Sequence, residues 1–208
     1  MLALLLGVSA LLVVTGDAQM IRQCTCAELE PCSHINSAMM LECSEQCQRH
    51  VTALGVSYPA VRQCEAEISG ALDNTINCIK RASAGTCARG PPRMIPKTYL
   101  ESFKLAFLTR IKGILSRSGI FDEMMAFFKT TKKYWNCKTK CVAKKAGNCK
   151  KRNGCGTLDP PDREAVEMYL NCAVQNGLDT NGFRRLCHCA ARAGVRNLDH
   201  LCDRVVVP

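Results

Sequence analysis

The segment 88–136, ARGPPRMIPKTYLESFKLAFLTRIKGILSRSGIFDEMMAFFKTTKKYWN, contains no cysteine and separates two groups of eight cysteines each. Between residues 100 and 115 its apolar side chains recur at the spacing of one helix face. The pair Ser118 and Gly119 interrupts this pattern, because glycine is a poor residue for a helix interior. The segment therefore predicts two amphipathic helices, which form a spine between two disulfide-linked halves.

The two spine helices have recognisable ends. The first begins at Thr98, and the second begins near Ile120 with Asp122 and Glu123 in its first turn. Two lysines precede Gly147, where the second helix is expected to end. Acidic residues at the start and basic residues at the end both complement the helix dipole, and glycine commonly follows the last helical residue.

The segment before the spine predicts a helical hairpin. Residues 39–54 and the residues from Ser57 onward each carry apolar side chains at helical spacing and are joined by a short turn. In an antiparallel hairpin Cys47 and Cys64 would face each other, so we favour a disulfide between them. Cys43 shares a helix face with Cys47 and points alongside it, so we expect Cys43 to pair elsewhere.

The last third of the chain predicts two more helices and a short final turn. Asp179 or Thr180 caps the second helix, and Asn197 opens the final turn. The expected segments are 162–177, 179–194 and 197–202. No alternating run of β-branched residues with hairpin turns occurs in the sequence. The expected fold class is therefore all-α, with disulfide-rich helical hairpins around a central cysteine-free helical pair.

The expected organisation follows from these helices and from the proline-rich linker at 90–92. Residues 19–90 form an N-terminal cysteine-rich helical block, and residues 97–147 contain the central amphipathic and basic helices. Residues 148–208 form a C-terminal cysteine-rich helical block. We expect the three parts to make one domain.

The N-terminus has the features of a secretory signal. The first fourteen residues are almost continuously apolar, and the small residues Gly16 and Ala18 suit signal peptidase. Residues 1–18 are therefore predicted to be a signal peptide that is cleaved before Gln19, with a membrane anchor as the alternative. No later stretch approaches the roughly twenty apolar residues of a membrane span. We expect a soluble, secreted and extracellular mature protein without a transmembrane segment.

Export determines what the sixteen cysteines do. Thiols in an oxidising compartment pair with each other, so up to eight disulfides are expected. The cysteines expected to form them are Cys24, Cys26, Cys32, Cys43, Cys47, Cys64, Cys78, Cys87, Cys137, Cys141, Cys149, Cys155, Cys172, Cys187, Cys189 and Cys202. The run Cys187-His188-Cys189 also invites a zinc site, but zinc sites built on thiolates usually contain CxxC pairs, and this sequence has none. We expect no bound metal and no cofactor.

A basic run within 129–152 is the strongest functional signal. It contains ten Lys or Arg residues and no acidic residue, in a chain of formal net charge +10. Five of its lysines share one face of the second spine helix, opposite a broad apolar side that includes Phe128 and Trp135. The predicted anion-binding residues are Lys129, Lys132, Lys133, Lys140, Lys144, Lys150, Lys151 and Arg152. Such a surface attracts sulfated glycosaminoglycans or other anionic extracellular partners.

The basic run has two other possible roles, a solvated surface and a nucleic-acid interface. It can be a solvated face that keeps the protein in solution. Nucleic acid is not expected as a partner, because aromatic stacking platforms are not interleaved with the lysines.

Catalysis is not expected, because the sequence has no GxSxG, HExxH, Walker loop or dinucleotide fingerprint. It also lacks the adjacent cysteines and the His-Asp pair of secreted phospholipases.

Several cysteine-containing stretches resemble a known family. They are residues 21–26 (IRQCTC), the Cys43-x3-Cys47 pair, residues 56–64 (VSYPAVRQC) and the segment from Cys137-x3-Cys141 to Gly156. Together they resemble the chondroitin proteoglycan 4 domain of small secreted invertebrate proteins. The resemblance implies an all-helical, cysteine-rich extracellular module with a matrix or egg-associated role and no catalysis. It supplies no site residues.

The sequence therefore favours a secreted, disulfide-stabilised extracellular matrix or binding protein that contacts anionic glycans. A cationic, membrane-active defence protein is the first alternative. The apolar helix faces carry cysteines, however, which indicates that these faces are used inside the fold. A secreted enzyme of unrecognised type is the second alternative.

Overall fold

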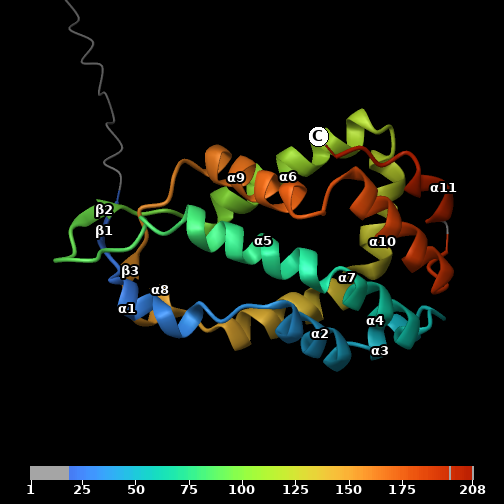
Figure 1. Ribbon diagram of the computed structural model, residues 1–208, viewed down its shortest axis with the longest axis horizontal. Coiled ribbons are helices and arrows are strands. Elements are labelled where there is room, and N and C mark those ends of the chain that lie inside the picture. The colour runs from blue at the N-terminus through green and yellow to red at the C-terminus, as the bar shows by residue number, and fades with distance from the viewer. Residues whose placement is uncertain (1–18, 197, 208) are drawn as a thin grey trace, which may run out of the picture.

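The computed structural model describes residues 19–196 and 198–207, so the predicted signal peptide at 1–18 and the predicted start of the final turn at Asn197 lie outside the described residues. Helices make up 66% of the described residues (Figure 1). All sixteen cysteines form disulfides. The prediction of an all-α, disulfide-rich fold is confirmed. No helix in the described ranges is both long enough and apolar enough to cross a membrane.

Eleven α-helices and one 3-10 turn occur in the described part of the chain. They are α1 (Cys26–Leu29), η1 (Glu30–Cys32), α2 (Ser37–Gln46), α3 (Arg49–Thr52), α4 (Tyr58–Glu67), α5 (Ser69–Ala82), α6 (Leu100–Arg117), α7 (Phe121–Ala146), α8 (Cys149–Arg152), α9 (Asp162–Gln175), α10 (Thr180–Arg192) and α11 (Asp199–Cys202). The predicted spine corresponds to α6 and α7. Gly119 and Gly147 follow these helices with positive φ angles of 65° and 75°, which glycine adopts without steric cost.

Five of the longer helices form a closed ring of contacts. In this ring α6 packs on α9, α9 on α5, α5 on α2 and α2 on α7, and α7 returns to α6. In Figure 1, α5 crosses the middle of the molecule, with α6 and α9 on one side and α2 on the other. The spine helices are therefore members of the ring rather than an axis between two halves.

A small sheet closes one end of the ring. Strand β1 (Met20–Gln23) pairs antiparallel with β2 (Met94–Pro96) and parallel with β3 (Cys155–Gly156). At Gly156 a Cβ atom would stand 2.9 Å from Cγ2 of Ile21, so a side chain there would force the strands apart. These strands were not predicted from the sequence, because two to four residues are too few to show an alternating pattern.

Six of the eight disulfides join the first group of cysteines to the second group. They are Cys24–Cys155, Cys32–Cys149, Cys43–Cys141, Cys47–Cys137, Cys64–Cys189 and Cys78–Cys172. Only Cys26–Cys87 and Cys187–Cys202 stay within one group. The two blocks are thus cross-linked to each other instead of forming two separately linked halves.

The favoured Cys47–Cys64 disulfide was wrong. Cys47 bonds to Cys137 of α7, and Cys64 bonds to Cys189 of α10. The predicted helix over 39–54 ends at Gln46 and resumes only as the short α3, so it does not form the long hairpin arm that the pairing assumed. The expectation that Cys43 pairs away from its own helix is confirmed by its bond to Cys141 of α7.

Candidate anion-binding surface

Five lysines form a continuous stripe along the exposed side of α7. We call Lys129, Lys132, Lys133, Lys140 and Lys144 the lysine ridge; all five are exposed. At 1.5 Å per residue the ridge extends about 22 Å along the helix axis. Within the described residues none of the five forms a salt bridge. The predicted α7 part of the site is therefore available to a ligand.

Disulfides determine which side of α7 faces outward. Cys137 and Cys141 bond to Cys47 and Cys43 of α2, with Cα–Cα distances of 5.8 and 5.6 Å. Each pair of cysteines is separated by four residues, so each pair lies on one helix face. The two bonds hold α7 antiparallel to α2, and the lysine ridge runs beside the two cysteines toward the side of α7 away from the buried Tyr134.

A buried polar network supports the same orientation. The hydroxyl of Tyr134 lies 2.5 Å from Oγ of Ser44 and donates a hydrogen bond of 2.7 Å to Oε1 of Glu65. Nζ of Lys138 donates to the same carboxylate oxygen at 2.7 Å. Burial raises the pKa of Tyr134, so its hydroxyl stays protonated and keeps donating. The network links α7 to α2 and α4 on the inner side of the helix.

Two basic residues of the run form salt bridges with neighbouring helices. Lys138 pairs with Glu65, and Nζ of Lys145 lies 2.6 Å from Oε2 of Glu42. Neither lysine was among the predicted anion-binding residues. Charges on the inner side of α7 are thus matched by carboxylates of α2 and α4, and the lysine ridge is left without such partners.

The remaining predicted residues lie on α8. Lys150, Lys151 and Arg152 are exposed, and Nζ of Lys150 lies 3.2 Å from Oδ2 of Asp159. The disulfide Cys32–Cys149 fixes this short helix. At Gly147, between α7 and α8, a Cβ atom would stand 2.9 Å from Sγ of Cys32. This connection therefore needs glycine for its close approach as well as for its positive φ.

An exposed apolar strip runs beside the lysine ridge. Met125, Phe128 and Trp135 of α7 are exposed. They are separated by three and seven residues, which puts them on one side of the helix. Nζ of Lys138 lies 5.7 Å from the ring centroid of Trp135, a cation–π distance. Phe128 and Trp135 belong to the broad apolar side predicted for this helix, and both lie at the boundary between its buried and exposed sides.

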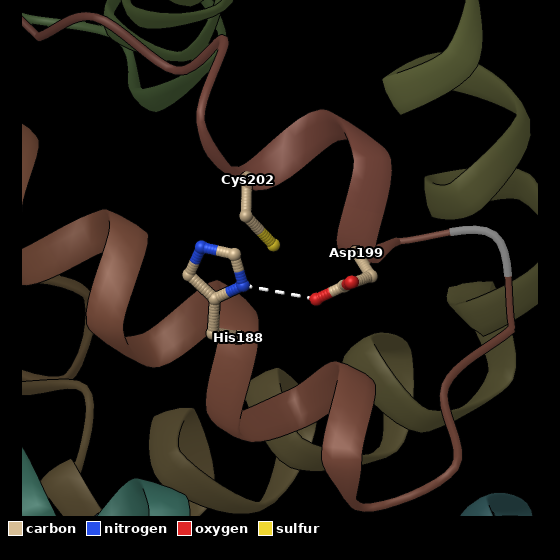
Figure 2. Close-up of side chains that lie close together, drawn as sticks. All are labelled: His188, Asp199 and Cys202. Carbon is tan, nitrogen blue, oxygen red and sulfur yellow. Dashed lines mark hydrogen bonds and ion pairs between the residues drawn. The ribbon is translucent and has the colours of Figure 1, made fainter.

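The one metal-like cluster found in the described residues contains His188, Asp199 and Cys202 (Figure 2). Sγ of Cys202 is bonded to Cys187, so it is not a thiolate ligand. Nδ1 of His188 lies 2.9 Å from Oδ1 of Asp199, and Nε2 lies 3.0 Å from Oδ1 of Asp203. The two carboxylates contact opposite nitrogens of the ring, so one ion cannot bind His188 together with both.

This arrangement is instead suited to a protonated histidine. Carboxylates only accept hydrogen bonds, so His188 satisfies both neighbours only when both ring nitrogens carry protons. The hydrogen bonds that His188 donates to Asp199 and Asp203 raise its pKa above the ordinary value. The cluster therefore joins α10 to α11 through an ion pair beside the Cys187–Cys202 disulfide.

Comparisons with protein-family models, with curated proteins and with solved structures each find no match for this chain. The resemblance to the chondroitin proteoglycan 4 domain therefore stays a prediction.

Proposed function

We propose that this chain is a secreted, disulfide-stabilised protein of the extracellular matrix that binds sulfated glycans along the lysine ridge. Eight disulfides are compatible with an extracellular protein, since such bonds persist mainly in oxidising compartments. The function rests on the ridge, and one observation carries it. Among the described residues, Lys138 and Lys145 of α7 are paired with carboxylates, and the five lysines of the ridge form no salt bridge.

The shape of the ridge favours a linear polyanion. The five ammonium groups follow one helix axis for about 22 Å instead of surrounding a pocket. A sulfated polysaccharide repeats its negative charges along a chain, so it can meet several lysines at once and release counterions. The exposed ring of Trp135 beside the ridge can pack against the apolar face of a sugar ring.

The rigidity of the scaffold also supports binding. Two disulfides and the Tyr134 network hold α7 in place, so its backbone loses little freedom when a ligand binds. Only the lysine side chains need to become ordered. A rigid row of charges also discriminates between anions by the spacing of their charges.

The test is elution from a heparin column by salt. The variant Lys133→Gln/Lys140→Gln removes two ridge charges, and we expect a roughly fivefold to tenfold loss of affinity and a smaller salt dependence. The matched control is Lys80→Gln/Lys104→Gln, which removes two exposed lysines from α5 and α6. Equal elution of the two variants would show that heparin senses only net charge, and the proposal would fail.

A further inference from the structure

Helix α6 presents leucines to solvent. Leu100, Leu105 and Leu108 have 61%, 67% and 63% of their surface exposed. A helix turns by about 100° per residue, so these three leucines lie within about 140° of one another around the axis. Single exposed leucines are common on protein surfaces, but three on one side of one helix form a patch.

Basic residues share this side of the helix. Lys104 and Lys112 lie between the leucines around the axis, and both are exposed. We call Leu100, Lys104, Leu105, Leu108 and Lys112 the outer face of α6. Glu101 is the acidic residue in this sector. The outer face therefore combines large apolar side chains with a net positive charge.

Within the described residues the fold uses little of the outer face, where Nζ of Lys112 lies 5.4 Å from the ring centroid of Phe121. The opposite side of α6 packs on α9, where the rings of Phe103 and Tyr169 lie 5.4 Å apart. Nε of Arg110 lies 2.6 Å from Oε1 of Glu167, which also belongs to α9. Ile114 is buried on this side as well, and Leu115 is buried near the end of the helix, in a cluster with Ile120 and Leu201. These contacts hold α6 in place, and nothing in the described residues covers its outer leucines.

Helix α6 also differs from its neighbours in its chemistry. Among the described helices of eight or more residues, it alone carries no cysteine. No disulfide therefore directs the apolar residues of α6 toward the interior of the fold. Its apolar residues are divided between an inner side that packs and an outer side that does not.

We propose that the outer face of α6 docks on the surface of an anionic phospholipid bilayer, with the helix parallel to the membrane plane. Leu100, Leu105 and Leu108 enter the boundary between headgroups and acyl chains, and Lys104 and Lys112 remain among the anionic headgroups. This division of apolar and basic side chains is that of an interfacial amphipathic helix. The proposal concerns a surface other than the lysine ridge and does not depend on glycan binding.

Charge favours a bilayer over a second copy of the chain. Two outer faces packed together would bring four lysines into contact, in a protein of formal net charge +10. A hydrated glycan is also a poor partner, because it offers the leucines no apolar surface. An anionic bilayer satisfies both kinds of residue, since it has negative headgroups above an apolar interior.

The test measures binding to sedimented vesicles of phosphatidylcholine, alone or mixed in equal weight with phosphatidylglycerol. We expect the wild-type protein to bind the mixed vesicles and Leu105→Gln/Leu108→Gln to bind them about tenfold or more weakly, because each leucine loses its burial. The matched control is Leu54→Gln/Leu158→Gln, which changes two other exposed leucines and should bind like the wild type. Elution from heparin should be the same for all three proteins.

A second measurement keeps the proposal testable if the double variant misfolds. In Leu108→Trp, the added indole should emit at shorter wavelength when mixed vesicles are added, and Trp135 of the wild type should not respond. A response of Trp135 without a response at position 108 would place the lipid on α7 and overturn the proposal.

Three other outcomes overturn it. The first is a wild-type protein that ignores the mixed vesicles. The second is equal binding by Leu105→Gln/Leu108→Gln and the wild type, which would assign the attraction to overall charge. The third is a concentration-dependent dimer in sedimentation velocity that Leu105→Gln/Leu108→Gln abolishes, which would make a second copy the occupant.

Discussion

Helices α6 and α7 are consecutive in the chain and differ in how they are held. α7 has 26 residues, of which only Tyr134 is buried, and two disulfides attach it to α2. α6 has no disulfide and buries Ile114 and Leu115. Disulfide bonds can thus hold a helix in the fold in place of extensive apolar burial. A helix that is bonded to its neighbour can expose a row of lysines, and a helix without a bond must bury part of its apolar surface.

The same contrast separates the two proposed binding surfaces. The lysine ridge lies on a helix fixed by disulfides and by the Tyr134 network, so it presents charges at defined positions. The outer face of α6 lies on a helix that is fixed by side-chain packing and by one ion pair, Arg110 with Glu167. The first surface suits a ligand with regularly spaced charges, and the second suits a deformable lipid surface.

The largest expected effect comes from removing both bonds between α7 and α2. Changing Cys43, Cys47, Cys137 and Cys141 to serine releases loops of about 20 and 10 residues in a chain still linked by Cys32–Cys149, and chain entropy predicts a loss of about 5 to 6 kcal/mol in the free energy of unfolding. For Cys187→Ser/Cys202→Ser, which opens a link across 15 positions, we expect about 3 kcal/mol. Denaturant unfolding of the oxidised proteins measures both. A larger loss in the second variant would contradict the view that α7 depends mainly on its disulfides.

A smaller effect is expected from weakening the packing of α6. Phe103→Ala removes the ring that contacts Tyr169 of α9, and we expect a loss of about 2 kcal/mol, since the phenylalanine is half-buried. Hydrogen exchange should quicken in α6 and remain unchanged in α7. The control is Phe183→Ala, which truncates an exposed phenylalanine of α10. Equal acceleration in α6 and α7 would mean that the two helices open as one unit.

The smallest expected effect concerns pH at the corner where α6 meets α7. Ile120 of that corner packs with Leu198 and Leu201, and the ion pairs of His188 hold this segment. The pKa of His188 is raised in the folded protein, so its stabilising effect is complete below pH about 6.5 and is lost as the pH rises through the folded pKa. The melting temperature should therefore fall slightly between mildly acidic and mildly basic pH.

A pair of variants tests the assignment to His188. His188→Gln should remove the decrease in melting temperature, and His34→Gln should retain it, because His34 is exposed and forms no salt bridge in the described ranges. A melting temperature that rises with pH in the wild-type protein would refute the assignment. Proton NMR titration of the histidine rings gives the pKa of His188 directly.

Helix ends were the most predictable part of the fold. The acidic first turn of α7, its end before Gly147 and the Asp179 cap of α10 agree with the structure, because each depends on neighbouring residues alone. The disulfide partners depend on contacts distant in sequence. One signal was available: the only cysteines spaced by four residues are Cys43 with Cys47 and Cys137 with Cys141. Two such pairs on facing antiparallel helices form two disulfides, as observed.

The candidate surface was predictable only in part. Helical spacing predicts the lysine ridge, because charged residues on one side of a helix remain in solvent. The same spacing cannot decide on which side a boundary residue such as Phe128 falls, since that depends on how the helix is rotated against its neighbours. Leu105 and Leu108 are harder still, because apolar residues are ordinarily assigned to the interior.

The connectivity of the disulfides constrains how the chain matures. Six cysteines of the first group have partners that are synthesised only after residue 136. Until the second group of cysteines has been synthesised, these six thiols stay reduced or form temporary bonds with one another. Correct oxidation therefore comes late in synthesis, and any temporary bonds must be reshuffled, a slow step that isomerases catalyse.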